Sequence, residues 1–187
     1  MLNHGTLSPL MPIAISGTHC AGKSTLVDDL IERLPYWESI AEPYHVLEEE
    51  GYDFGEVPTL EDFEAQLTRS LQLIREQRQN VIFDRCPLDF VAYALCLADS
   101  ESFNVRVWLP QLREAVSALD LIVFLPIDNR ISVPLSEDDD YRIAVDEKLR
   151  EILLDNTFDL EMVVLEVTGT REERVRQVLE RLSHRKH

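Results

Sequence analysis

Short, mostly apolar runs alternate along this chain with longer segments in which apolar residues recur every three or four positions. A short continuous apolar run is typical of a strand that is buried on both faces of a parallel sheet. These runs predict five strands, at about residues 12–16, 38–42, 81–84, 120–125 and 162–167.

The segments between the strands have the spacing of amphipathic helices. Thr59, Asp89 and Thr170 precede three of them and are predicted N-caps, because their side-chain oxygens can accept hydrogen bonds from free backbone N–H groups. Pro110 is predicted to open another helix, since proline is tolerated in a first turn. The predicted helices span about residues 23–34, 60–79, 90–97, 110–118, 141–154 and 171–182.

Strands that alternate with helices predict an α/β fold, a parallel sheet covered by helices on both faces. The 187 residues are enough for one domain with a substantial core. We expect a flexible tail at 1–11, a single domain at 12–187, and a lid at about 126–142, where prolines and acids interrupt the pattern. The carboxyl ends of parallel strands meet at one edge of the sheet, so the segments that follow the strands should share a cleft.

Residues 17–24 follow the first predicted strand and match G-x-x-x-x-G-K-[ST], the phosphate-binding P-loop. Its glycines let backbone N–H groups turn inward toward phosphate oxygens, and the start of the next helix favours an anion. Lys23 would supply charge to the β- and γ-phosphates, and Ser24 would bind Mg²⁺. We therefore expect ATP and Mg²⁺, with the nucleotide held by Gly17, Thr18, His19, Cys20, Ala21, Gly22, Lys23, Ser24, Thr25 and Gly169.

The net charge of −17 disfavours nucleic acid and anionic membranes as main partners, because both would be repelled. No apolar stretch approaches the roughly 18 residues of a membrane span. The three cysteines, Cys20, Cys86 and Cys96, form no C-x-x-C pair, so we expect a reduced, cytoplasmic chain. The sequence leaves a homodimer open.

Two further predicted strands end near carboxylates. Glu42 precedes Pro43, which favours an extended backbone for Glu42, and Asp84 ends the apolar run 81–84. Asp84 is a candidate Mg²⁺ ligand together with Ser24. Either Glu42 or Asp84 is placed to take a proton from an acceptor hydroxyl.

Three arginines are candidates for stabilising a transferring phosphoryl group: Arg85, directly after Asp84, and Arg130 and Arg142 in the predicted lid. A guanine-binding Asn-Lys-x-Asp stretch is absent from the sequence, which disfavours a GTPase. A base, cationic groups and a lid are what transfer to a small-molecule hydroxyl requires. The alternatives are an ATPase that uses water, and a nucleotide-binding module that switches a partner without turnover.

Each of these side chains also has a structural interpretation. Glu42 could be a solvated strand end, and Arg85 could pair with an acid such as Asp89. Arg130 and Arg142 lie in an acidic segment and could be paired there.

The chain resembles deoxynucleoside kinases and viral thymidine kinases in its P-loop, in Glu42-Pro43, and in Asp84-Arg85-Cys86-Pro87. The resemblance implies a three-layer αβα P-loop fold with five parallel strands in the order 2-3-1-4-5. It implies a nucleoside-like acceptor whose 5′-hydroxyl proton is accepted by Glu42, while Arg85 contacts phosphate. It also implies that Gln66, on the predicted helix 60–79, reads the base; the alternative is an ordinary exposed helix position.

The chain departs from this family in its lid. The kinases carry an arginine-rich lid, whereas residues 136–140 here read Ser-Glu-Asp-Asp-Asp. The segment 84–89 is also similar to a broad group of short kinase-like AAA ATPases, which includes nicotinamide-riboside-kinase-like domains. The sequence therefore predicts a small-molecule kinase without choosing its acceptor.

Overall fold

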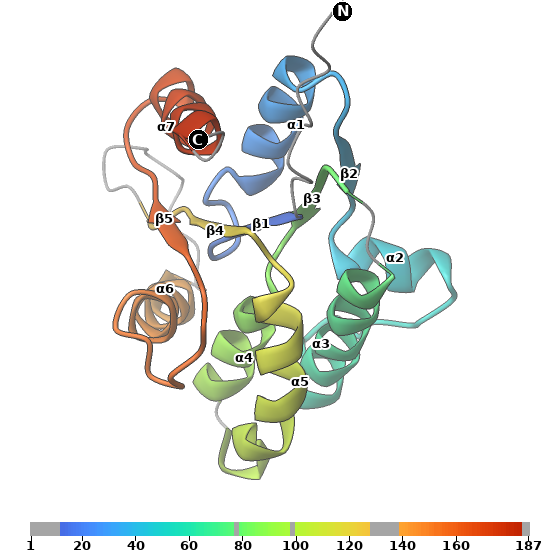
Figure 1. The fold of residues 1–187 in the computed structure, drawn as a ribbon. Coiled ribbons are helices and arrows are strands. Elements are labelled where there is room, and N and C mark those ends of the chain that lie inside the picture. The colour runs from blue at the N-terminus through green and yellow to red at the C-terminus, as the bar shows by residue number, and fades with distance from the viewer. Residues whose placement is uncertain (1–11, 77–78, 98–99, 128–138, 185–187) are drawn as a thin grey trace, which may run out of the picture.

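The computed structural model describes residues 12–76, 79–97, 100–127 and 139–184. Its centre is a five-stranded parallel sheet in the order β2-β3-β1-β4-β5, as predicted (Figure 1). Its inner strands are fully buried, because each is apolar on both faces. The strands span Ile13–Ser16 (β1), Glu38–Ile40 (β2), Val81–Asp84 (β3), Leu121–Phe124 (β4) and Val164–Glu166 (β5).

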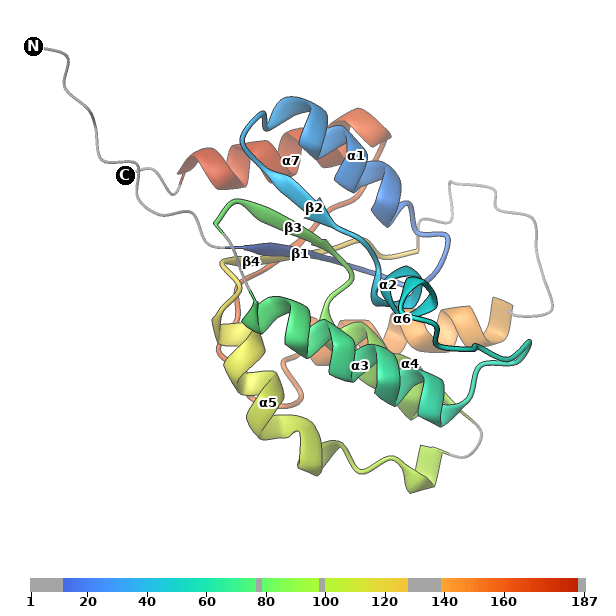
Figure 2. The same cartoon turned by 90° about the vertical axis from the view of Figure 1, so that its right-hand side faces the viewer.

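Helices cover both faces of the sheet, which gives the three predicted layers (Figure 2). Helices α1 and α7 pack on one face around Leu30 and Val178, while α3, α4, α5 and α6 pack on the other around Leu67 and Phe90. The helices span Lys23–Arg33 (α1), Pro43–Glu49 (α2), Leu60–Arg75 (α3), Pro87–Cys96 (α4), Val105–Ser117 (α5), Asp139–Leu153 (α6) and Arg171–Ser183 (α7), with a 3₁₀ turn at Ser100–Ser102.

Two predicted N-caps are confirmed. Thr59 and Thr170 each accept a hydrogen bond from the backbone N–H three residues later, and the acid at that position bonds back to the cap. These are capping boxes, which satisfy two free donors at once.

Other predicted helix boundaries are wrong. Helix α4 begins at Pro87, with Cys86 as its N-cap, so Asp89 lies inside the first turn and is not the cap. Helix α5 begins at Val105, where Asn104 caps it, and Pro110 lies inside the helix. A proline there removes one backbone donor from the helix, while the Asn104 side chain satisfies another at its start by accepting from the Arg106 N–H. Helix α3 ends at Arg75, short of the predicted end at 79.

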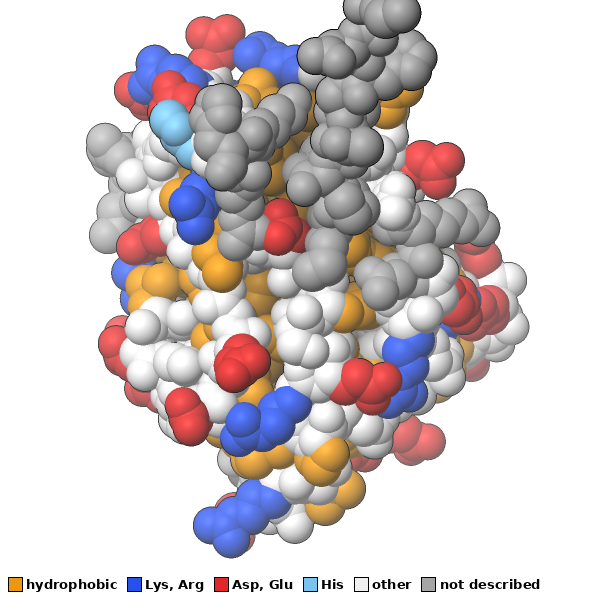
Figure 3. Space-filling model, in the orientation of Figure 1, with side chains coloured by type: hydrophobic (Ala, Val, Ile, Leu, Met, Phe, Trp, Pro, Cys, Tyr) orange, Lys and Arg blue, Asp and Glu red, His pale blue; other side chains and the backbone are white. Residues whose placement is uncertain are grey.

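The surface is charged but mixed on the face that Figure 3 presents, where acidic and basic side chains are interspersed with apolar ones. The chain has 35 acidic residues and 18 lysines and arginines, and on this face the acidic residues do not form a single patch. Among the described residues, no helix is both long enough and apolar enough to span a membrane.

Candidate active site

The phosphate loop connects β1 to α1 at the carboxyl edge of the sheet. Gly17 has φ +151°, and a Cβ added there would lie 2.6 Å from the carbonyl oxygen of Leu125 at the end of β4. Gly22 has φ +91°, a left-handed conformation that disfavours residues with a side chain. Both motif glycines are thus required by the backbone, which confirms that the 17–24 spacing encodes a tight turn.

Lys23 is buried at the first position of α1, and its Nζ donates to the carbonyl oxygen of Thr18 at 2.8 Å. Burial, together with the nearby Arg85 guanidinium, lowers the pKa of Lys23 to about 8. The ammonium group therefore lies within the turn of the loop. An anion bound there would favour the protonated form of Lys23 and so raise its pKa again.

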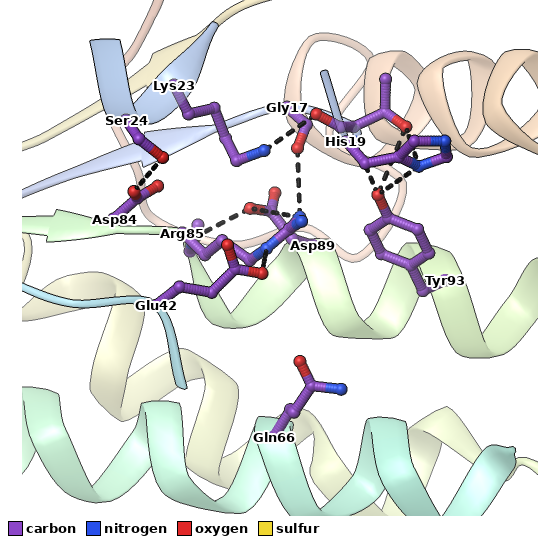
Figure 4. A network of polar contacts seen from close by, with 12 residues as sticks. Gly17, His19, Lys23, Ser24, Glu42, Gln66, Asp84, Arg85, Asp89 and Tyr93 are labelled. Atoms are coloured by element: carbon purple, nitrogen blue, oxygen red, sulfur yellow. Dashed lines mark hydrogen bonds and ion pairs between the residues drawn. The ribbon is translucent and has the colours of Figure 1, made fainter. Parts of the chain in front are cut away.

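Ser24 and Asp84 meet as the sequence predicted. Ser24 Oγ donates to Asp84 Oδ2 at 2.7 Å (Figure 4). The other carboxylate oxygen, Asp84 Oδ1, is buried and has no hydrogen-bond partner in the described part of the chain. Burial raises the pKa of Asp84. A hydroxyl beside an unsatisfied carboxylate oxygen is a donor set that fits Mg²⁺.

Arg85 is held in an unusual conformation directly after β3. Its φ is +91°, although it is not glycine, and its backbone N–H donates to Ile15 O at 3.0 Å. Its side chain is buried, with Nη1 donating to Gly17 O at 3.3 Å and Nε donating to Glu42 Oε1. A left-handed non-glycine residue is strained and persists where its surroundings fix it. Arg85 is fixed between the phosphate loop and Glu42.

Asp89 lies beneath the loop and is fully buried. Ser16 Oγ donates to Asp89 Oδ1, the backbone N–H of Cys86 donates to Oδ2 at 3.2 Å, and Arg85 Nη1 lies 4.0 Å from Oδ2. The predicted Arg85–Asp89 ion pair is therefore present, but it is buried. Burial raises the pKa of Asp89 to about 6, against the opposing effect of Arg85 and Lys23.

Glu42 lies beyond the end of β2, at the N-cap of α2, and not on the strand where the sequence placed it. Pro43 fills the first helical position, where a missing N–H is harmless. This turn directs the Glu42 side chain toward Arg85 (Figure 4).

A cavity of about 660 Å³, which we call the aromatic pocket, opens beside Glu42 and Arg85. Gln66 is buried in its wall on α3 and faces the cluster of Glu42, Arg85 and Tyr93 (Figure 4). The ordinary exposed position is therefore excluded for Gln66, whose Nε2 donates to Asp62 O at 3.2 Å. The lining residues are His19, Glu42, Tyr44, Phe54, Gly55, Val57, Pro58, Asp62, Phe63, Gln66, Arg85, Phe90, Tyr93, Cys96, Leu97 and Tyr141.

A second cavity of about 450 Å³, the α7 pocket, lies on the other side of the phosphate loop. It brings Gly169 together with the loop, as the sequence predicted, and it is also lined by Thr25. Arg174 on α7 enters it and donates from Nη1 to Ala21 O at 3.1 Å. This arginine was not predicted, because nothing in the amphipathic pattern of α7 distinguishes it from surface arginines.

The predicted lid is described only at its two ends. Arg142, on α6, donates from Nε to the His19 carbonyl oxygen at 3.0 Å, which brings it to the phosphate loop. Residues 128–138, including Arg130, lie outside the described part of the chain.

Two polar residues of α4 were not recognised as site residues from the sequence. Asp89 and Tyr93 lie four residues apart in an otherwise apolar helix, so they share one face. That spacing, counted from Arg85, was the signal that could have identified them.

A family model described as an AAA domain matches residues 12–174, which is most of the chain. The chain belongs to this AAA domain family. The comparison with curated proteins gives no match.

Solved structures share the fold of this AAA domain protein. Deoxyadenosine kinase from M. mycoides, with the products dCMP and dCDP bound, has a TM-score of 0.65 at 21% identity, covering 94% of this chain and 100% of that one. Thymidylate kinase from Candida albicans has a TM-score of 0.64 at 19% identity, with coverage of 97% and 94%. Shikimate kinase from Acinetobacter baumannii has a TM-score of 0.58 at 15% identity, with coverage of 95% and 95%. The predicted resemblance to P-loop small-molecule kinases is confirmed at the level of fold.

Proposed function

We propose that this AAA domain protein transfers the γ-phosphoryl group of ATP, with Mg²⁺, to a hydroxyl of a nucleoside-like small molecule. One observation carries the proposal: Glu42 and Arg85 lie in the wall of the aromatic pocket while Arg85 also touches the phosphate loop at Gly17. An ATPase needs space for water only, whereas a cavity of about 660 Å³ beside the loop suits an organic acceptor.

On the donor side, the loop amides and the buried Lys23 would bind the β- and γ-phosphates. Ser24 Oγ and Asp84 Oδ1 would hold Mg²⁺, which supplies charge neutralisation for the phosphates. The α7 pocket, with Gly169 and Thr25, would receive the rest of the nucleotide.

On the acceptor side, Glu42 would accept the hydroxyl proton, and Arg85 would hold Glu42 in place and stabilise the transferring group. Arg142 is a further cation at the loop, and we retain Arg130 as a lid candidate from the sequence. Gln66 would form hydrogen bonds with polar atoms of the acceptor ring, which would lie in the aromatic pocket beside Phe63.

The charge of the aromatic pocket favours an acceptor without an anionic group. Among its described lining residues, Arg85 is the one lysine or arginine, and it is paired with Glu42. Asp62 adds a second carboxylate to the wall. A phosphate monoester or a carboxylate would meet these acids, whereas a neutral nucleoside would meet aromatic rings and one amide.

The setting that we propose is cytoplasmic. Cys20, Cys86 and Cys96 are all described and are all free thiols, which suits a reducing compartment.

The decisive experiment measures ADP formation from Mg-ATP with and without a panel of acceptors. The panel pairs neutral nucleosides (adenosine, deoxyadenosine, thymidine) with anionic compounds (thymidine monophosphate, shikimate). We expect ADP formation that depends on a neutral nucleoside. Turnover at the same rate without any acceptor would replace the proposal with an ATPase, and tight binding without turnover would replace it with a switch module.

A Glu42→Gln variant tests the base. We expect a loss of acceptor phosphorylation on the order of 10²–10³-fold, because proton transfer loses its acceptor. Glu48→Gln, at an exposed carboxylate on the same helix, is the matched control. Parent-like rates in Glu42→Gln would remove Glu42 from the mechanism.

A further inference from the structure

Tyr93, on α4, lines the aromatic pocket and also contacts the phosphate loop. Its ring is buried in the pocket wall, stacked on Phe63 with centroids 5.2 Å apart at 20°, and the guanidinium carbon of Arg85 lies 5.2 Å from the ring centre. The hydroxyl end of the same side chain contacts residues 18 and 19 of the phosphate loop (Figure 4).

The hydroxyl of Tyr93 bonds to the first half of the loop. It accepts a hydrogen bond from the backbone N–H of His19 at 2.7 Å, and it lies 3.3 Å from Thr18 Oγ1 and 3.2 Å from His19 Nδ1. These contacts join parts of the chain that are 74 residues apart.

The His19 N–H and the Thr18 C=O are the two polar ends of one planar peptide unit. Lys23 Nζ donates to that same Thr18 oxygen at 2.8 Å. In a trans peptide the two groups point in opposite directions, so Tyr93 holds one end of the plane and Lys23 bonds to the other. Rotation of this plane would move the Lys23 contact.

We infer that Tyr93 is a positioning residue, whose hydroxyl fixes the Thr18–His19 peptide and thereby the Lys23 ammonium group from within the wall of the aromatic pocket. The inference rests on the proposed donor site, because its consequence is a weaker hold on the β- and γ-phosphates when the hydroxyl is removed. The stack on Phe63 needs only the ring, so phenylalanine separates the two roles.

The test compares Tyr93→Phe with the parent chain. Calorimetry measures the affinity for the Mg²⁺ complex of a non-hydrolysable ATP analogue, and hydrogen exchange follows the amides of residues 17–23. We expect an affinity lower by about five- to tenfold, the loss of one net hydrogen bond, and faster exchange in that segment. We expect the melting temperature to change no more than in the control.

The control is Tyr52→Phe, which also loses one tyrosine hydroxyl bond, from Tyr52 to Asp62 Oδ1 at 3.1 Å, away from the loop. Its analogue affinity and loop exchange should match the parent. If Tyr93→Phe binds the analogue and exchanges like the parent, or if Tyr52→Phe is affected equally, the inference is overturned. If the parent itself binds no analogue, the proposed donor site fails, and the exchange rates of residues 17–23 still decide the role of Tyr93.

Discussion

The phosphate loop and the aromatic pocket lie side by side but are built from different material. The loop is one continuous stretch, 17–24, and its shape comes from backbone conformation at Gly17 and Gly22. The pocket is assembled mainly from side chains on α2, α3, α4 and α6 and on the segment 54–58, together with Glu42, Arg85 and one residue of the loop, His19. A site made from backbone constrains residue spacing and leaves a motif, whereas a site made from scattered side chains can be rebuilt for another ligand without changing the loop.

The largest expected effect comes from removing the buried lysine of the loop. Lys23→Met should reduce phosphoryl transfer on the order of 10³-fold, because a buried cation aimed at the phosphates is lost. Binding of a nucleoside to the aromatic pocket, measured by calorimetry, should stay within twofold. Lys148→Met on α6 is the control and should retain both activities. If Lys23→Met weakened nucleoside binding as strongly as it reduced phosphoryl transfer, the loop and the pocket would not be separable.

Asp89 lies near Arg85, which touches both regions, and the burial of Asp89 should make stability depend on pH. Its pKa is raised to about 6 in the folded chain, so the folded state binds more protons than the unfolded state between about pH 4 and 6. Relative to Asp89→Asn, the parent should therefore gain about 2 kcal/mol of unfolding free energy as the pH falls from 7 to 4. Urea unfolding of both chains across this range measures the difference. A difference that is independent of pH would contradict the raised pKa.

The next prediction concerns the proposed Mg²⁺ site, which joins Ser24 of the loop to Asp84 at the end of β3. Asp84→Asn keeps a partner for Ser24 but removes the carboxylate charge, so the Mg²⁺ concentration for half-maximal activity should rise by on the order of 10²-fold. A Mg²⁺ titration at saturating ATP measures this. Asp28→Asn, at an exposed position of α1, should leave the titration unchanged.

The smallest expected effect concerns the pocket alone. Gln66→Leu should raise the acceptor KM about tenfold with the ATP KM unchanged, because one buried amide no longer bonds to the acceptor. Gln72→Leu, an exposed glutamine on the same helix, is the matched control. A rise in the ATP KM alone would place Gln66 with the donor site instead.

The contrast also explains what the sequence could predict. The strands, the helices on both faces and the phosphate loop followed from apolar runs and from glycine spacing, because these are local or repeating constraints. The strand order was implied only by the resemblance to deoxynucleoside kinases. The meeting of Ser24 with Asp84 followed from the rule that parallel strands end at one edge.

Residues whose roles depend on tertiary contacts were not predicted. Asp89 was predicted to be an N-cap, since its position before an apolar run fits one. Its pairing with Arg85 was foreseen, but its complete burial and the hydrogen bond that it accepts from Ser16 were not. Tyr93 was not singled out at all. Its four-residue spacing from Asp89 places both side chains on one helix face, but it does not show that the Tyr93 hydroxyl contacts a residue 74 positions away. Arg174 was hidden among the other arginines of α7.

The ten residues from Asp84 to Tyr93 run from the proposed metal site, past the loop, into the pocket wall. Thermodynamic linkage makes any coupling through them reciprocal. If a bound acceptor raises the affinity for ATP by some factor, bound ATP raises the affinity for the acceptor by the same factor. Selection for a new acceptor that reshapes α4 would therefore also retune the response of the chain to cellular ATP. Substitutions on α3 could change the acceptor without that second effect.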